Sequence, residues 1–76
     1  MRDEFLVSLG NRLKTLRMDK SLTQSELSLK SSLDRTYISN LENGKRNPSI
    51  LSLRRIAYAL EVPIEKLLTE SKNRVL

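Results

Sequence analysis

The side chains in this sequence that are best suited to chemistry are cationic hydrogen-bond donors. The chain carries 14 Lys and Arg against 9 Asp and Glu, which gives a formal net charge of +5 and a pI near 10.0. Between Gly44 and Leu60 there is no acidic residue but four basic ones, namely Lys45, Arg46, Arg54 and Arg55. This balance favours a polyanionic partner, nucleic acid first and an anionic membrane surface second. A solvated basic face that only aids solubility is the alternative at this point.

The residue types on which most enzymes and metal sites depend are missing. With no cysteine and no histidine, the chain lacks the usual zinc ligands and the usual general base at neutral pH. No glycine-rich phosphate loop or nucleophile setting accompanies the carboxylates. We therefore expect no enzyme, no metal, no cofactor and no small-molecule ligand. Because no apolar run reaches roughly 20 residues and residues 1–10 do not resemble a signal peptide, we expect a soluble cytoplasmic protein that spans no membrane.

Hydrophobic periodicity and capping residues predict five helices and no strand. The first helix should run from about Asp3 to about Met18, with apolar residues at spacings of three and four. A fourth helix, capped by Ser49, carries an apolar face of Ile50, Leu53, Ile56, Ala57 and Leu60. Pro63 suits the first turn of a fifth helix. The expected fold is all-α, a compact five-helix bundle forming one domain over residues 1–76, with a frayed tail over residues 71–76.

The two middle helices are short and clearly delimited. Thr23 and Glu26 have the spacing of a capping box at the start of the second helix. Asp34 caps the third helix, and Gly44 can take the left-handed conformation that ends it. Two short helices joined by a tight turn, the second followed by a basic loop, form the outline of a helix-turn-helix over residues 23–44.

Such a unit needs one small residue and several apolar ones at fixed positions, and the sequence meets these demands. Ser28 is the small residue at the helix contact, and the apolar positions are occupied by Leu27, Leu33, Ile38 and Leu41. In this motif the second helix lies in the major groove of DNA, with its N-terminal residues at the base edges. The pattern therefore predicts DNA binding.

Candidate contacts to bases follow from this geometry. Arg35 and Thr36 lie at the exposed start of the third helix, where Arg can bind guanine and Thr can contact thymine. Asn40 lies one turn further along the same face and is the next candidate for a base contact, and Ser39 could contact a base or a phosphate. For Arg35, an ordinary surface charge is the alternative.

Candidate contacts to the DNA backbone flank this helix. The free N–H groups at the start of the second helix, with Thr23 and the amide of Gln24, suit a phosphate, although hydrogen bonds within the helix are the alternative. Lys45, Arg46 and Asn47 in the following loop share this expected role. Tyr37 stays open between core packing and a phosphate contact.

Four motifs follow one another along the chain: Thr23-Gln24 with Leu27, Asp34-Arg35-Thr36-Tyr37-Ile38-Ser39, Leu41-Glu42-Asn43-Gly44-Lys45, and Pro48-Ser49. Together they resemble the phage-repressor family of helix-turn-helix domains, from Leu6 to Leu68. The resemblance implies a five-helix homodimer that regulates transcription by binding double-stranded DNA, with an inverted-repeat operator. More narrowly, the chain is similar to controller proteins of restriction–modification systems. An antitoxin or a phage-type repressor of the same fold, acting through a protein partner, is the alternative.

The resemblance also implies contacts that composition and spacing do not reveal. Arg17 and Glu42 would form a partly buried ion pair between the first and third helices, although two unrelated surface charges are the alternative. Part of the apolar excess on the last two helices would form the dimer interface, and the residues expected there are Leu51, Ile64, Leu67 and Leu68. The alternative is that all of them face inward.

The sequence departs from the family pattern at two turns. Ser32 and Glu61 stand where the family commonly has glycine. We expect the turn at Ser32 to reach its backbone angles by a milder route than the left-handed conformation.

Overall fold

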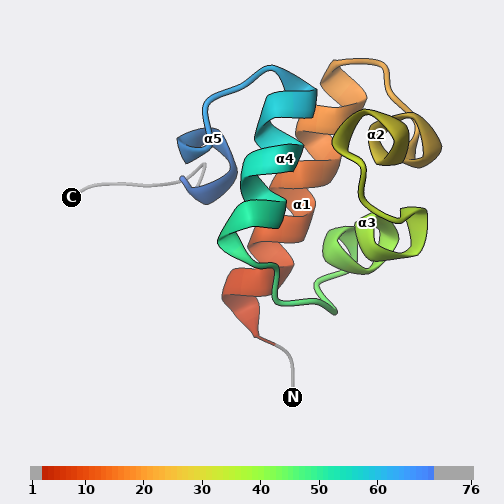
Figure 1. Ribbon diagram of the computed structural model, residues 1–76. Coiled ribbons are helices and arrows are strands. Elements are labelled where there is room, and N and C mark those ends of the chain that lie inside the picture. Colours follow the sequence, from red (N-terminus) through yellow and green to blue (C-terminus); the bar gives the residue numbers. More distant parts are fainter. Residues whose placement is uncertain (1–2, 70–76) are drawn as a thin grey trace.

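The computed structural model describes residues 3–69, and within this range it contains five helices and no strand (Figure 1). In chain order the helices are α1 (Glu4–Asp19), α2 (Gln24–Ser31), α3 (Arg35–Glu42), α4 (Ile50–Leu60) and α5 (Glu65–Leu68). The all-α, five-helix architecture expected from the sequence is therefore confirmed. The expected frayed tail, residues 71–76, lies outside the described residues.

Local capping marks where the first four helices begin. The side chain of each capping residue accepts a hydrogen bond from a backbone N–H of the first turn, and these residues are Asp3, Thr23, Asp34 and Ser49. Thr23 and Glu26 form the full capping box, with reciprocal hydrogen bonds of 3.0 and 2.8 Å. Because the first N–H groups of a helix have no partner within it, these side chains stabilise each start locally.

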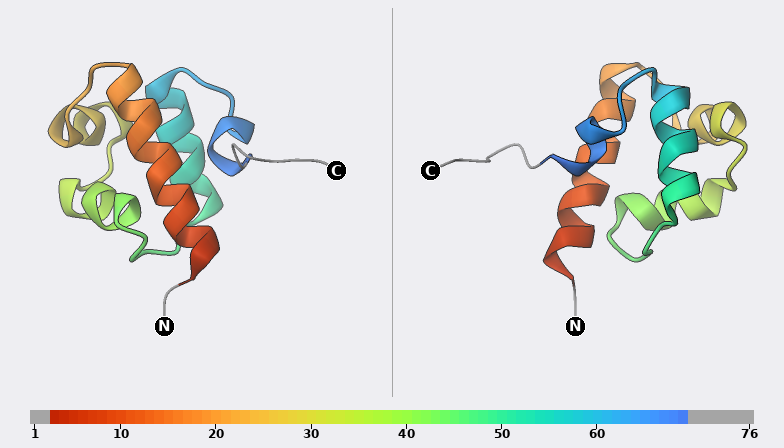
Figure 2. Two further views of the ribbon diagram at one scale, coloured as in Figure 1. Left: turned by 180° about the vertical axis from the view of Figure 1, so that it is seen from behind. Right: turned by 60° about the vertical axis from the view of Figure 1, so that its left-hand side comes forward.

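The hydrophobic core lies between α1, α4 and the shorter helices. The helices α2 and α3 lie on one side of the bundle and α5 lies on the other (Figures 1 and 2), and α1 packs against both α3 and α5. Every helix contributes to the core cluster, which consists of Leu9, Leu13, Leu27, Ile38, Leu41, Leu53, Ile56, Ala57, Leu60 and Leu67. The core thus fixes α3 against the rest of the bundle by one face only.

The close approach of α1 to the end of α3 depends on a glycine. A Cβ added at Gly10 would overlap the carbonyl oxygen of Leu41 and lie 2.7 Å from that of Glu42. Real Cβ atoms essentially never approach another heavy atom this closely. Gly10 therefore sets the distance between α1 and α3.

The expectation for the turn at Ser32 was wrong. Ser32 has φ 61° and ψ 29°, and Glu61 has φ 59°, so both non-glycine residues adopt the left-handed conformation. The turn brings the N–H of Leu33 to the carbonyl of Ser28 at 3.3 Å, and Leu33 packs against the core. This packing outweighs the left-handed conformation, which costs about 1–2 kcal/mol per non-glycine residue.

Two expectations about the last two helices also need correction. Ile50 does not join the buried face of α4; it lies in the first turn and stays 65% exposed. The helix α5 begins at Glu65, after a turn in which the N–H groups of Lys66 and Leu67 donate to the carbonyls of Pro63 and Ile64. Pro63 therefore lies before α5 and not in its first turn, and its carbonyl accepts a hydrogen bond within the tighter turn that leads into the helix.

Candidate nucleic-acid interface

The four residues expected to contact bases all lie on α3 outside its buried face. Arg35 and Thr36 in the first turn are exposed, whereas Ser39 and Asn40 are partly buried. The buried face includes Ile38, which is fully enclosed. One face of α3 is thus fixed by the core, and guanidinium, hydroxyl and amide groups are distributed over the rest of the helix. These are the groups that make hydrogen bonds to base edges in the major groove.

Tyr37 connects α3 to the basic loop that follows it. Its ring is partly buried and packs against the core cluster. The guanidinium carbon of Arg46 lies 4.7 Å from the ring centroid, a cation–π contact. The structure thus shows the core packing that was one expectation for Tyr37, and the phosphate contact stays a prediction. No sequence signal pairs an aromatic residue with a loop arginine nine positions later, so this contact was missed.

The basic loop is held in place from its first residue. Gly44 has φ 71°, as expected for the residue that ends α3, and the N–H of Lys45 donates to the carbonyl of Asn40 at 2.9 Å. A Cβ at Gly44 would lie 3.0 Å from the Cα of Val7 on α1, so the loop turns directly against that helix. Beyond it, the polar loop residues Lys45, Arg46 and Asn47 are exposed.

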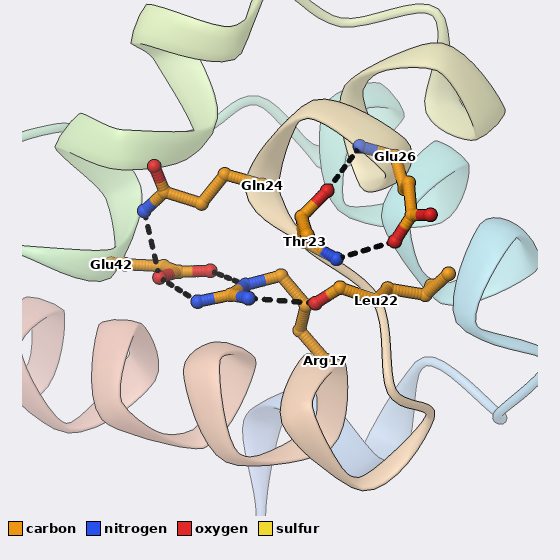
Figure 3. A network of polar contacts seen from close by, with 6 residues as sticks. All are labelled: Arg17, Leu22, Thr23, Gln24, Glu26 and Glu42. Atoms are coloured by element: carbon orange, nitrogen blue, oxygen red, sulfur yellow. Dashed lines mark hydrogen bonds and ion pairs between the residues drawn. The ribbon is translucent and has the colours of Figure 1, made fainter.

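A buried ion pair joins α1 to the end of α3. Arg17 donates from Nε to Oε2 of Glu42 at 2.5 Å and from Nη2 to Oε1 at 2.9 Å, a bidentate contact (Figure 3). The side chains are only 10% and 3% exposed. The hydrogen bond with Glu42 raises the pKa of Arg17, and burial opposes this shift. Removing one partner of such a buried pair strands the other charge, which costs about 3–5 kcal/mol at the upper end.

The same pair holds the start of α2. Arg17 also donates from Nη1 to the carbonyl of Leu22 at 2.7 Å, and the side-chain amide of Gln24 donates to Oε1 of Glu42 at 3.0 Å. Three helices therefore meet at one carboxylate (Figure 3). The contact between Gln24 and Glu42 was not anticipated from the sequence, because these residues are 18 positions apart and on different helices.

Thr23 has fewer free hydrogen-bonding groups than the sequence suggested. Its hydroxyl oxygen accepts the N–H of Glu26, and its own N–H donates to the carboxylate of Glu26. A phosphate contact by Thr23 would therefore depend on its hydroxyl hydrogen alone. Gln24, which is partly buried, keeps one amide N–H in addition to the one that it donates to Glu42.

The residues expected at a dimer interface separate into two groups. Leu51 is 62% and Leu68 is 38% exposed, and Ile64 is partly buried. Leu67, in contrast, is fully enclosed in the core of the same chain, and its inclusion in the interface was wrong. Helical spacing could not separate Leu67 from Leu68, because α5 contains only four residues.

Other kinds of site find no support in the part of the chain that the structure describes. Residues 3–69 contain no group of three or more His, Cys, Asp or Glu side chains that could bind a metal ion. None of the five helices is long and apolar enough to cross a membrane.

The fold and this surface define the class of protein. Residues 13–67 match the family model HTH_3, described as helix-turn-helix, and the chain belongs to this family. It is a DNA-binding transcriptional regulator and not an enzyme.

Its relatives include several regulators. The chain is 38% identical over 69 residues to the control protein C.MunI of a Mycoplasma species, covering 90% of this chain and 93% of that protein. It is 35% identical over 69 residues to the control protein C.BamHI of Bacillus amyloliquefaciens, covering 90% and 85%. The crystal structure of the restriction–modification controller protein C.AhdI from Aeromonas hydrophila matches with a TM-score of 0.84 and 38% identity, covering 86% of this chain and 98% of that one.

Proposed function

We propose that this protein is the controller of a restriction–modification system, acting in the cytoplasm as a homodimer on an inverted-repeat operator. The observation that carries the proposal is the similarity to controller proteins, which extends over about nine-tenths of the chain. A phage-type repressor is the second candidate, because the immunity repressor of Bacillus phage phi105 is also a relative. That relative is less similar, at 33% identity, and the chain spans only 44% of its length.

In this proposal α3 enters the major groove. Arg35 binds guanine through its guanidinium group, and Thr36 contacts a neighbouring base, with Ser39 and Asn40 as further base contacts. The exposure of Arg35 and Thr36 in the first turn supports these roles. Asp34 caps that turn and so holds both side chains at the end of the helix that approaches the bases.

Backbone phosphates would be bound on both sides of α3. The amide of Gln24, with the hydroxyl of Thr23, acts at the start of α2, and Lys45, Arg46 and Asn47 act from the loop. The hydroxyl of Tyr37 contributes a further phosphate contact next to Arg46. The exposure of the loop residues and the cation–π contact that orients Arg46 support this arrangement.

The proposed dimer uses apolar residues at the start of α4, just before α5 and on α5. Leu51, Ile64 and Leu68 were expected there, and Ile50 joins them because it is 65% exposed next to Leu51. Exposed apolar residues on these two helices support an interface between copies. In a two-fold dimer that binds one face of DNA, the two copies of α3 lie about 34 Å apart, one helical turn.

Selection of DNA fragments by the purified protein at a stated salt concentration tests the operator. We expect an inverted repeat with half-site centres about ten base pairs apart. Binding should weaken steeply as salt rises, because each phosphate that a cation neutralises releases counterions. Selected fragments without two-fold symmetry would contradict the homodimer, and a flat salt titration would contradict the phosphate contacts.

Sedimentation at micromolar concentration tests the dimer. Leu68→Lys places a charge in the proposed interface and should convert the dimer to a folded monomer that binds a full operator much more weakly. Leu29→Lys is the matched control, because Leu29 is 82% exposed on α2 and away from the interface. The interface is refuted if the wild type is monomeric, or if both variants sediment as dimers.

A further inference from the structure

The carboxylate of Glu42 has more hydrogen-bonding partners than an ion pair requires. Arg17 occupies both of its oxygens, and the amide of Gln24 adds a third hydrogen bond at Oε1 (Figure 3). Glu42 is 6% exposed, so this arrangement lies beneath the surface. Gln24 is the first residue of α2 and, unlike Glu42, is only partly buried, so the network extends from the buried carboxylate to a residue that solvent reaches.

The charge of Glu42 determines which way this amide points. An ionised carboxylate accepts hydrogen bonds and donates none, so it attracts the amide nitrogen and repels the amide oxygen. Gln24 Nε2 accordingly faces Glu42, whereas Oε1 points away from it (Figure 3). The opposite orientation would bring the amide oxygen against a carboxylate that is largely buried.

We propose that Glu42 is a positioning residue for DNA binding, which holds the amide of Gln24 so that its second N–H donates to a DNA phosphate. This inference rests on the proposed phosphate contact of Gln24. A glutamine that is already fixed loses less side-chain entropy when it binds. Because Glu42 is also the last residue of α3, the same carboxylate fixes the phosphate contact relative to the helix that contacts the bases.

A double-mutant cycle on DNA affinity tests the coupling. Gln24→Ala should weaken operator binding about tenfold or more per subunit, the range for a hydrogen bond to a charged group. Glu42→Gln should weaken it comparably, and should have little further effect when combined with Gln24→Ala. Affinity is measured where circular dichroism shows each variant to be folded. Independent, additive effects of the two substitutions would overturn the proposal.

Whether Glu42→Gln raises or lowers the affinity for DNA separates a positioning role of Glu42 from a general effect of its charge. Removing a carboxylate raises the net charge, which by itself strengthens binding to DNA. Glu61→Gln is the matched control, because it removes the same charge at an exposed position outside the network. We expect Glu61→Gln to leave affinity unchanged or slightly higher and Glu42→Gln to lower it. Since the lost donor is neutral, the salt dependence should stay as in the wild type. An affinity for Glu42→Gln equal to that of the control would overturn the proposal.

A measurement on the free protein covers the case in which Glu42→Gln does not fold. Gln24 is the only glutamine in the chain, so selective nitrogen-15 labelling gives one pair of side-chain amide resonances. We expect these two resonances to show that the side-chain amide of Gln24 is held in one orientation before any DNA is added. A freely rotating amide would overturn the positioning role while leaving DNA binding intact, whereas a wild type without operator binding would refute the proposed function itself.

Discussion

Replacing Gly10 with alanine should destabilise the fold, because it separates α1 from the end of α3. The new methyl group would overlap the carbonyl oxygen of Leu41 and lie 2.7 Å from the carbonyl oxygen and 2.9 Å from the carbonyl carbon of Glu42. All three atoms belong to backbone, so no flexible side chain can move away. Relief requires a shift of α3 as a whole.

Two opposing terms decide the magnitude of this effect. Alanine is favoured over glycine in a helix interior by about 1 kcal/mol. Overpacking a core typically costs about 1–3 kcal/mol, and a clash with backbone lies at the upper end or beyond. The net free energy of unfolding should therefore fall by about 2 kcal/mol. For a domain of this size, such a loss lowers Tm by about 8–16 °C.

Thermal unfolding followed by circular dichroism measures this change. Asn11→Ala is the matched control, because Asn11 is the next residue of α1 and is exposed, so only helix propensity changes there. The control should unfold at or slightly above the wild-type temperature. If Gly10→Ala were as stable as Asn11→Ala, the close contact between α1 and α3 would be refuted.

Three further predictions follow from the same structure. Arg35→Ala should cost about 1–3 kcal/mol of binding free energy on the cognate site and relax discrimination at one base pair. Lys45→Ala should weaken binding to all sequences alike and make its salt dependence shallower. Equal losses of affinity on every sequence for both variants would contradict these roles. Ser32→Gly should raise the free energy of unfolding by about 1 kcal/mol, because glycine adopts φ 61° without strain, and a lower Tm would contradict this reading of the turn. The pKa of Arg17 is raised in the folded state, so its contribution to stability is complete below its pKa in the unfolded state and is lost only as pH rises through its pKa in the folded state. Arg17 should therefore add no pH dependence to the free energy of unfolding measured in urea near neutral pH.

The starts of α1 to α4 and the class of fold were predictable because their causes are local. Thr23 and Glu26 are three residues apart, and both hydrogen bonds of their capping box join neighbours in sequence. Asp34 and Ser49 act in the same way at the next helices. The apolar spacing within the helix-turn-helix likewise predicted that Ile38 would be buried. Composition alone argued for a polyanionic partner, because the charge of a chain does not depend on its fold.

Tertiary structure decided what depends on residues far apart in sequence. Ser32 adopts a left-handed conformation because Leu33 must reach the core, and no local signal requires it. Leu67 rather than Leu68 is enclosed because of how a four-residue helix packs, which spacing cannot determine. The amide of Gln24 meets the carboxylate of Glu42 only after α1, α2 and α3 have assembled. The sequence by itself determined the helices and the kind of partner, whereas the orientation of individual donors depended on packing, because packing brings together groups that the chain keeps apart.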